Sequence, residues 1–463
     1  VGVDCRTMLY TGIDYHKRYS VVCTVDAEGQ RVQSARIDQK EPTVFGVILG
    51  GFVASCEPAL KPKPPHIALL FTTFPKTSET FLQRDVAALQ AKGLNLKLYS
   101  LWGGGGVFNG LPVRSFNKWR LIEVFLVIIP WNCLRRPRLM RDLFEGVFTR
   151  RAPSWLNFWE NMLGAGFAGS FAREMRLDPP ALVHGAWAGA PATAGWVFWR
   201  MFGWPYSVGA HAYDLYEHGG DWWLLEKLQH ARFIHTSTEM GRRELVGRGV
   251  PPEKISCIRR GLDAFPAFKP LRPDRRPLRL LSIARLVPKK GLDHQLHIYA
   301  ALKEAGIEFE ARIVGEGPLR ELLELQAARL QLTGEVKFTG QLAQTEVWAQ
   351  LGWADVLLHT GVVAPSGDRD GLPNVIPEAM AAGVLVVTSP VAATTEAISQ
   401  ERTGLVADVD LPLAWVVALR RLGEDDKLAE KLRSAARRWV EEHYDAHKNT
   451  ARLVEGFEKA MRP

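Results

Sequence analysis

A chain of 463 residues is long enough for two or three domains, and 47% hydrophobic and 23% charged residues are typical of globular proteins. These values exclude wholesale disorder, a collagen-like fibre and a small disulfide-framed domain. The formal net charge of +8 favours an anionic partner, such as nucleic acid, anionic lipid or a phosphorylated small molecule, and does not choose among them.

The cysteine count and the apolar runs bear on location. Five cysteines without a C-x-x-C pair predict a reducing compartment, and hence a cytoplasmic protein. No charged segment followed by an apolar one is found at the start, so we expect no signal peptide. The longest apolar run, residues 121–131, is about half the length of a membrane-spanning helix and is interrupted by Glu123 and Pro130.

The first sixty residues differ from the rest of the chain. They hold three of the five cysteines and end at a proline-rich joint, residues 61–65. Residues 11–29 predict a strand, a turn and a strand, with a further turn near residues 28–29. Residues 1–40 resemble the opening of an insertion-sequence transposase, in which Asp14 would be a metal ligand. One carboxylate cannot build a two-metal site. We therefore expect residues 1–60 to be an appended fragment without a functional role.

From residue 66 onward, short apolar runs alternate with amphipathic stretches, which predicts parallel sheets covered by helices. The first domain, residues 64–265, has expected strands at 67–71, 94–98, 206–208, 233–235 and 255–258, and an expected helix at 79–92. The second domain, residues 275–440, has expected strands at 280–283, 311–314, 336–338, 355–358 and 384–388. Four prolines in residues 263–277 predict a hinge, so we expect two doubly wound α/β domains with a cleft between them.

Two loops of the second domain follow predicted strands. Arg285 and Lys290 lie just before a predicted helix, where two cations and free helix amides can bind an anion. A solvated basic turn is the alternative, since paired lysines are typical of surfaces. Gly315 and Gly317 follow the next strand and would let a ligand approach the backbone, although a tight turn explains them equally well.

The segment 366–383 is the densest signal. Asp370 precedes a turn at the start of a predicted helix, and Glu378 follows eight residues later. Helix amides could bind a phosphate here, while Glu378 could accept hydrogen bonds from ribose hydroxyls. A calcium loop would place its glutamate six residues after the glycine, but Glu378 comes seven after Gly371, so we expect no calcium site.

In order along the chain, residues 283–291, 314–320, 338–340 and 370–383 resemble the donor half of family 4 retaining glycosyltransferases, which have the GT-B fold. In the first domain, residues 73–81 are similar to a loop of members that build bacterial exopolysaccharide, and residues 211–214 resemble the family's His-x-x-Asp loop. The resemblance spans about residues 64–460. It implies two Rossmann-like domains facing across a cleft, with a C-terminal helix, residues 441–463, crossing back to the first domain.

The resemblance implies a hexosyltransferase that moves a sugar from a UDP- or GDP-sugar to a glycan or lipid-linked acceptor in polysaccharide biosynthesis, with retention of configuration. Arg285 and Lys290 would neutralise the departing diphosphate, so no metal and no other cofactor is expected. Asp370 would stand at the donor sugar, Glu378 at the ribose, and His211 would reach across the cleft.

Further residues complete the implied site. The donor side would include Gly315, Gly317, Gly371, Leu372, Pro373 and Asn374. Ser78, Glu79 and His184 are weaker candidates on the acceptor side. Two departures from the family pattern, Asp370 in place of the usual Glu and the altered loop at residues 393–396, leave open a nucleotide-sugar-binding protein without turnover. The charge and the transposase-like start leave a DNA-acting protein as a third hypothesis, although we expect no nucleic-acid partner.

Eleven of the fifteen tryptophans lie between Trp102 and Trp223, and residues 114–141 also carry a cluster of basic residues around the apolar run. Tryptophan and arginine beside apolar side chains predict a membrane interface, where rings lie among headgroups and cations meet anionic lipid. Ordinary core tryptophans beside a solvated basic helix are the alternative. On the first interpretation the protein is peripheral on the inner face of the cell membrane.

Overall fold

The computed structural model describes residues 10–15, 19–25, 31–38, 64–76, 79–117, 119–149, 154–391 and 393–462. They belong to two compact units, Val1–Pro65 and His66–Pro463. In the first unit, β1 (Tyr10–Tyr15), β2 (Tyr19–Val25) and β3 (Arg31–Asp38) form an antiparallel sheet in that order. The first two strands confirm the expected pattern, β3 was not predicted, and the expected turn at residues 28–29 lies outside the described residues.

The first domain of the second unit contains an eight-stranded sheet in the order β11-β10-β9-β8-β4-β5-β7-β6, parallel except for the β6–β7 pair. Its strands are β4 (Ile67–Phe71), β5 (Leu96–Ser100), β6 (Gly106–Phe108), β7 (Leu111–Ser115), β8 (Leu182–Gly185), β9 (Tyr206–Gly209), β10 (Phe233–Thr236) and β11 (Ile255–Cys257). Its helices are α1 (Thr80–Ala91), α2 (Arg120–Glu123), the π-helix η1 (Val124–Ile128), α3 (Ile129–Arg135), α4 (Pro137–Thr149), α5 (Trp155–Leu177), α6 (Ala190–Phe202), α7 (Ala212–Tyr216), η2 (Glu217–Gly219), α8 (Leu224–His230), α9 (Glu239–Gly247) and η3 (Pro252–Lys254).

The second domain contains a six-stranded parallel sheet in the order β14-β13-β12-β15-β16-β17. Its strands are β12 (Leu278–Ile283), β13 (Phe309–Val314), β14 (Val336–Gly340), β15 (Val356–His359), β16 (Leu385–Thr388) and β17 (Leu405–Val406). Its helices are η4 (Pro288–Lys290), α10 (Leu292–Glu304), α11 (Arg320–Arg329), α12 (Gln344–Trp353), α13 (Val375–Ala382), α14 (Thr394–Ala397), α15 (Pro412–Glu424) and α16 (Asp426–His443). The strand order reverses beside β12, which creates a crevice at the carboxyl ends of its strands.

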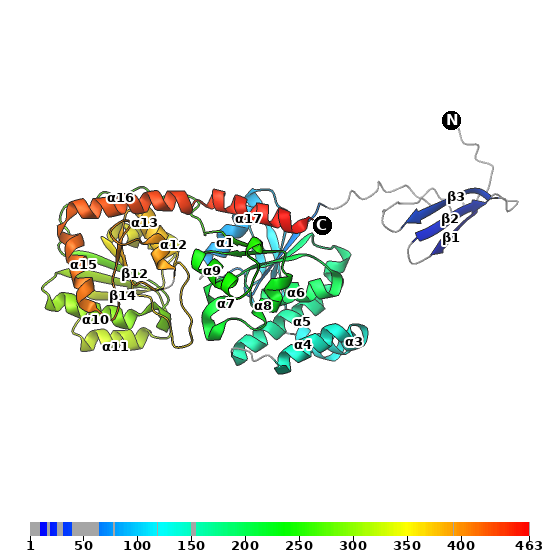
Figure 1. Cartoon of the computed structure of the whole chain (residues 1–463), viewed down its shortest axis with the longest axis horizontal. Helices are drawn as coiled ribbons and strands as arrows, with labels where there is room; N and C mark the ends of the chain where they lie inside the picture. The colour runs from blue at the N-terminus through cyan, green and yellow to red at the C-terminus, as the bar shows by residue number, and fades with distance from the viewer. Residues whose placement is uncertain are drawn as a thin grey trace, which may run out of the picture. The chain divides into compact units, whose positions relative to one another are not determined.

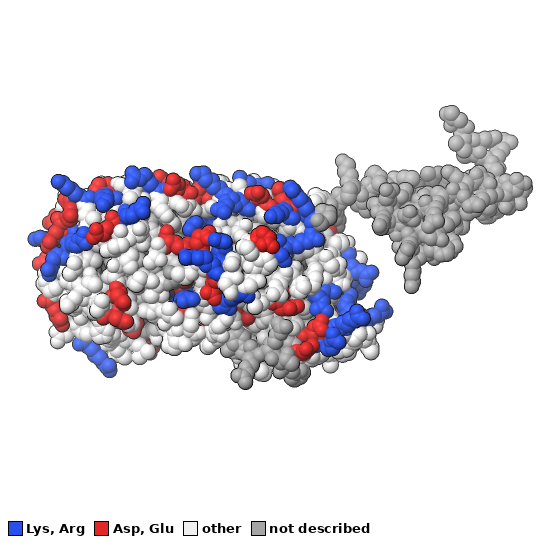
Figure 2. Space-filling model, in the orientation of Figure 1, with Lys and Arg blue, Asp and Glu red and all other residues white. Residues whose placement is uncertain are grey.

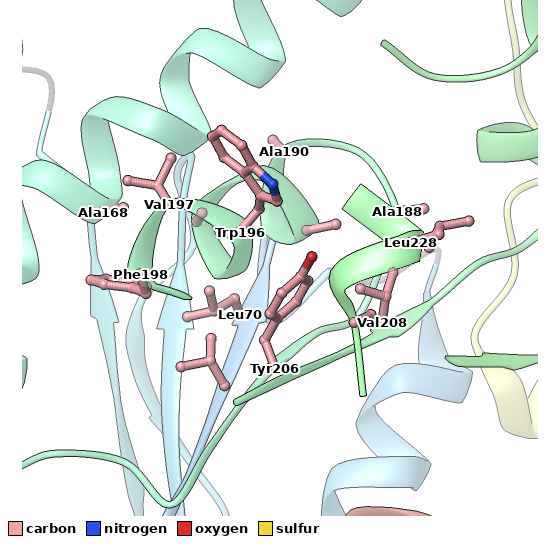
Figure 3. Packing of buried hydrophobic residues seen from close by; sticks show 14 of the residues in the cluster. Leu70, Ala168, Ala188, Ala190, Trp196, Val197, Phe198, Tyr206, Val208 and Leu228 are labelled. Carbon is pink, nitrogen blue, oxygen red and sulfur yellow. The ribbon is translucent and has the colours of Figure 1, made fainter. Parts of the chain in front are cut away.

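Alternation along β4 explains how helices cover both faces of the first sheet. Ala68 and Leu70 face one core cluster with residues of α5 and α6, whereas Ile67 and Leu69 face another with residues of α1 and of the final helix, α17 (Ala446–Met461). Figure 3 shows side chains of the first cluster, including Trp196 and Phe198 of α6 and Tyr206 of β9. Strands buried on both faces read as continuous apolar runs, which is why the sequence reveals them.

The two C-terminal helices connect the two domains. α16 packs against α13 and α15 of the second domain, and α17 packs against α1 and β10 of the first. Figure 1 shows the pair along one side of both domains. At the crossing, the Leu262 amide donates to the Tyr444 carbonyl (2.8 Å), and a Cβ on Gly261 would lie 2.2 Å from the Ala446 Cα. The close approach of these two backbones therefore requires glycine at position 261.

The tryptophans of the first domain range from buried to largely exposed, so they are not all ordinary core residues. Trp196 and Trp222 are buried in the core. Trp119, Trp131 and Trp155 are exposed at 67%, 53% and 73%, on or beside the helices α2, α3 and α5. In the described residues, no helix is both long enough and apolar enough to span a membrane.

Candidate active site

A cleft of about 470 Å³ separates the two domains of the second unit. Its walls are loops that follow the carboxyl ends of strands in both sheets, the usual place for ligands in open α/β sheets. The first domain contributes Thr72, Thr73, Lys76, Glu79, Phe81, Glu160, Trp187, Gly189, Ala190, His211, Ala212, Tyr213, Asp214, Asp221, Ser237 and Arg260. The second domain contributes Arg285, Lys289, Lys290, Asp370, Gly371, Leu372, Pro373 and Asn374.

The second-domain wall is built around Asp370. Its carboxylate lies 2.5 Å from Lys290 Nζ, 3.6 Å from Lys289 Nζ and 3.5 Å from His359 Nε2. Lys289 is 8% exposed and also pairs with Asp368 at 2.9 Å. The alternative of a solvated basic turn is therefore wrong for the two lysines, because η4 turns both of them toward acidic partners in the cleft wall, whereas Arg285 is exposed.

Electrostatics keeps Asp370 ionised. Burial alone would raise its pKa, but Lys290, His359 and Lys289 together hold that pKa well below its usual range. Burial lowers the pKa of His359, which favours the neutral ring. Arg285 is exposed at the same wall and has no ion-pair partner among the residues that the structure describes. An anion that enters the cleft therefore meets the guanidinium of Arg285, which has no ion-pair partner among the described residues. It also meets the two lysines of η4, whose charge is partly balanced by Asp370 and Asp368.

His211 faces this cluster from the first domain, at the N-cap of α7. Its amide donates to Asp214 Oδ2 (3.2 Å), which also accepts from the Ala188 amide (3.1 Å). Burial, Arg260 and His235 lower the pKa of His211 well below its usual range, so the ring is neutral at physiological pH. Its Nδ1 is buried and finds no hydrogen-bond partner among the described residues.

Asp214 orients that loop. Burial and the nearby Asp221 raise its pKa to about 7, more than the hydrogen bonds from Ala188 and His211 lower it. Asp221 itself forms a buried ion pair with Lys227 (2.6 Å). The carboxylate of Asp214 therefore connects the loop after β8 with the start of α7, and so fixes where His211 enters the cleft.

Glu378 lies on α13, as predicted, but it faces the other domain. It is 6% exposed, and its Oε1 lies 3.1 Å from Arg84 on α1. Burial raises its pKa, while Arg84 lowers it. Glu378 is not among the residues that line the 470 Å³ cleft. In this structure its carboxylate is paired with Arg84 instead.

The remaining predicted residues are only partly brought together. Residues 371–374 and Glu79 line the cleft, and Glu79 pairs with Lys76 at 2.8 Å. Gly315 and Gly317 do not line the cleft. They pack against the backbone of the loop after β12, where a Cβ would lie 1.9 Å from the Ala284 carbonyl oxygen and 2.4 Å from the Leu286 carbonyl oxygen, respectively. These glycines admit the protein's own backbone in this structure.

His184 and Ser78 complete the set. His184 lies within the sheet, where its Nδ1 is 2.9 Å from Ser207 Oγ and its ring stacks on His235. The structure does not bring it to the cleft. Ser78 lies outside the described residues.

Sequence reasoning missed several residues of the site. Lys289 and His359 surround Asp370, and Glu160 and Arg260 line the first-domain wall. Arg260 stacks over the Phe81 ring at 3.1 Å, and burial lowers its pKa to about 10. His359 ends β15, so the strand-end rule that selected Arg285 could have found it. Within the described residues, no group of three or more His, Cys, Asp and Glu side chains could hold a metal ion.

Comparison with known families decides the affiliation. Residues 86–264 match Glycosyltransferase Family 4, and residues 265–439 match Glycosyl transferases group 1. The chain therefore carries a Glycosyltransferase Family 4 domain followed by a Glycosyl transferases group 1 domain. The two matched regions meet between residues 264 and 265, so they correspond to the paired domains that the sequence motifs indicate.

Curated relatives of this chain carry names from amylovoran and colanic acid biosynthesis. The amylovoran biosynthesis glycosyltransferase AmsK of Erwinia amylovora is 33% identical over 223 residues, which are 48% of this chain and 55% of AmsK. WcaL of Escherichia coli, whose name places it in colanic acid biosynthesis, is 35% identical over 190 residues, 40% of this chain and 47% of WcaL. The chain thus spans about half the length of the curated relatives it matches.

Solved structures agree on the fold. Anabaena Alr3699/HepE in complex with UDP-glucose superimposes with a TM-score of 0.62 at 17% identity, over 85% of this chain and 99% of HepE. The sucrose-phosphate synthase of Thermosynechococcus elongatus gives a TM-score of 0.65 at 15% identity, over 85% and 98%. The expected GT-B arrangement of two Rossmann-like domains is confirmed.

Proposed function

We propose that this glycosyltransferase moves a sugar from a nucleotide-sugar donor, a UDP- or GDP-sugar, to a glycan or lipid-linked acceptor in polysaccharide biosynthesis. The observation that carries the proposal is the cleft itself: Arg285, Lys289 and Lys290 stand on one wall, and a neutral His211 with a free ring nitrogen stands on the other. The cationic wall would bind the diphosphate of the donor, and the wall that carries His211 would face the sugar. AmsK and WcaL act on bacterial exopolysaccharides by their names, and HepE was solved with UDP-glucose, which favours a UDP donor.

The proposed reaction retains the anomeric configuration. The bond between the sugar C1 and the diphosphate oxygen breaks while the acceptor hydroxyl oxygen bonds to C1 on the same face. The departing phosphate oxygen takes the hydroxyl proton. Arg285 and Lys290 stabilise the charge that develops on the diphosphate, the role that a protein-held metal would otherwise have. Asp370, 2.5 Å from Lys290, stands where the donor sugar would lie beside the diphosphate.

Binding of the donor ribose by Glu378 would require a change in the ion pair that this residue forms with Arg84. Its carboxylate is paired with Arg84 across the domains, so hydroxyls of the ribose would have to share it with Arg84 or replace it. Closure of the domains around the donor would exclude water and so limit hydrolysis.

We also propose a peripheral location on the inner face of the cell membrane, in the cytoplasm. Eleven of the twenty-four large exposed apolar side chains in the described residues lie between Trp119 and Trp159. Figure 2 shows Lys and Arg side chains gathered at the lower right of the view, where Figure 1 places α3 and α4. Exposed aromatic rings beside cations favour an anionic lipid surface.

A thermal-shift panel of UDP, GDP, ADP, TDP and their sugars tests the donor site. A ligand at a hundredfold excess over its dissociation constant stabilises the folded state by about 2.7 kcal/mol. We expect one base to stabilise the wild type, and Lys290→Ala and Glu378→Ala to abolish the shift. Lys337→Ala, an exposed lysine on β14, is the matched control. Stabilisation without release of free nucleotide from the sugar donor would indicate binding without turnover, and no stabilisation by any nucleotide would refute the donor site.

A further inference from the structure

A second cavity, of about 660 Å³, lies in the first domain. It is open to the surface and lies between α2, η1, α3 and α4 on one side and α5 and α6 on the other. Its walls are almost entirely apolar side chains, among them Leu121, Phe125, Ile128, Leu139, Leu143 and Met162. The volume is that of a small-molecule binding site, and such sites are lined mainly by apolar side chains.

This apolar cavity adjoins the polar cleft. Thr72, Glu160 and Ala190 line both of them. A single molecule could therefore place an apolar part in the cavity and a polar part in the cleft. Burial raises the pKa of Glu160, while Lys76 lowers it, so the carboxylate at the junction retains a proton more readily than an exposed one.

The chemistry of the walls restricts the apolar part. Sugars and nucleotides carry hydroxyl and phosphate groups that would lose their hydrogen bonds among aliphatic and aromatic side chains. A hydrocarbon chain loses none and gains by leaving water. On the cleft side of the junction, Lys76 and Arg260 present cations to an anionic headgroup.

The outer surface of the same helices fits delivery from a membrane. Phe125 lines the cavity and is also 56% exposed, and Trp131 on α3 is 53% exposed with the Arg135 guanidinium 4.7 Å from its ring centre. An aromatic face with cations beside it complements a lipid that carries phosphate.

We propose that this cavity binds the hydrocarbon chain of a lipid-linked acceptor, whose phosphate-bearing head then lies in the polar cleft. The inference rests on the proposed function for its acceptor, but the cavity's ligand can be tested without any transfer reaction. It assigns α2 to α4 to acceptor binding and leaves donor recognition to the second domain.

The test is calorimetric titration of the full chain with farnesyl phosphate and with dodecyl phosphate, both kept below micelle-forming concentrations, and with inorganic phosphate. Ala165 lies on α5 and lines the cavity, and Leu143 lines it from α4. We expect Ala165→Phe and Leu143→Trp to weaken binding of the tailed phosphates by about tenfold or more, because the new rings occupy the space of the chain. Ala328→Phe, on the exposed face of α11, is the matched control and should change the affinity by less than about twofold.

The nucleotide that stabilises the wild type is titrated into each variant as a measure of folding. Unchanged nucleotide binding with weakened tail binding supports the proposal, and a preference for farnesyl over dodecyl phosphate identifies an isoprenoid acceptor. Tail binding that is equal in all variants places the chain on the outer surface and overturns the proposal. If the wild type binds nucleotide but no tailed phosphate, the proposed role of the cavity is wrong and the donor site is unaffected. If the wild type binds no nucleotide at all, the proposed function itself is refuted.

Discussion

Replacing Lys290 by alanine tests the electrostatic account of the cleft most directly. The change removes the ammonium 2.5 Å from Asp370 and leaves Lys289 and His359 at 3.6 and 3.5 Å. The side chains of Lys290 and Asp370 are only 13% and 12% exposed, so water replaces the lost partner poorly. Breaking a buried ion pair costs about 3–5 kcal/mol, and the two retained partners should reduce the loss of unfolding free energy to about 2 kcal/mol.

Lys290→Ala should lower the activity by more than its loss of stability explains, and the two effects can be measured separately. Losing one group that stabilises developing charge lowers turnover by about 10²–10³-fold, or roughly 3–4 kcal/mol of transition-state stabilisation. Release of nucleoside diphosphate at saturating donor measures turnover, and urea unfolding measures stability. A double-mutant cycle with Asp370→Asn should give a coupling of about 1–3 kcal/mol in stability, since the two groups are in contact.

One result would refute this reasoning. If Lys290→Ala loses about 2 kcal/mol of stability but keeps turnover and nucleotide affinity within about twofold of the wild type, Lys290 serves only to balance Asp370. The leaving group would then depend on Arg285. Lys337→Ala, on β14, should leave both quantities unchanged and reports the effect of losing a surface charge.

Three further changes probe other parts of the structure. The pKa of Asp214 is raised from 3.8 to about 7 in the folded state, so the unfolding free energy of the wild type falls as pH rises from about 4 to 7 and then levels off. Asp214→Asn should therefore be more favourable relative to wild type at pH 8 than at pH 5, by about 2.7 kcal/mol in urea unfolding, at about 1.36 kcal/mol for each pH unit between 5 and 7. An equal difference at both pH values would contradict the shift. Glu396 accepts hydrogen bonds from two amides at the start of α9 (3.1 and 2.7 Å), so Glu396→Ala should cost about 1–3 kcal/mol of unfolding free energy, whereas Glu401→Ala at a 48% exposed site should cost under about 0.5 kcal/mol. Gly315→Ala should lower the melting temperature markedly, because its φ is +138° and its Cβ would lie 1.9 Å from a carbonyl oxygen, while Gly334→Ala, with open space around it, should not; equal melting temperatures would show that the loop after β13 relaxes freely.

Periodicity and turn residues revealed the parallel strands because each is short, apolar and flanked by a helix. The expected strands at 67–71 and 206–208 coincide with β4 and β9 within a residue or two, and the helix expected at 79–92 is α1 with Glu79 and Lys92 as its caps. Two of the strands that escaped prediction, β6 and β7, have weaker patterns, whereas β8 was missed although it is fully buried. β6 and β7 follow a glycine run and are largely exposed, so they lack the apolar run that marked the others.

The sequence by itself determined which residues end the strands, and hence that Arg285, Lys290 and Asp370 would meet at one edge of the second sheet, because carboxyl ends of parallel strands share an edge. Only the tertiary structure decided what each side chain faces. The domains bring Arg84 to Glu378, and η4 turns Lys289 into the wall beside Asp368, although the two partners in each pair are far apart in sequence. The apolar cavity was likewise beyond prediction, since a run of hydrophobic residues indicates burial but not whether the helices that carry it close completely against one another.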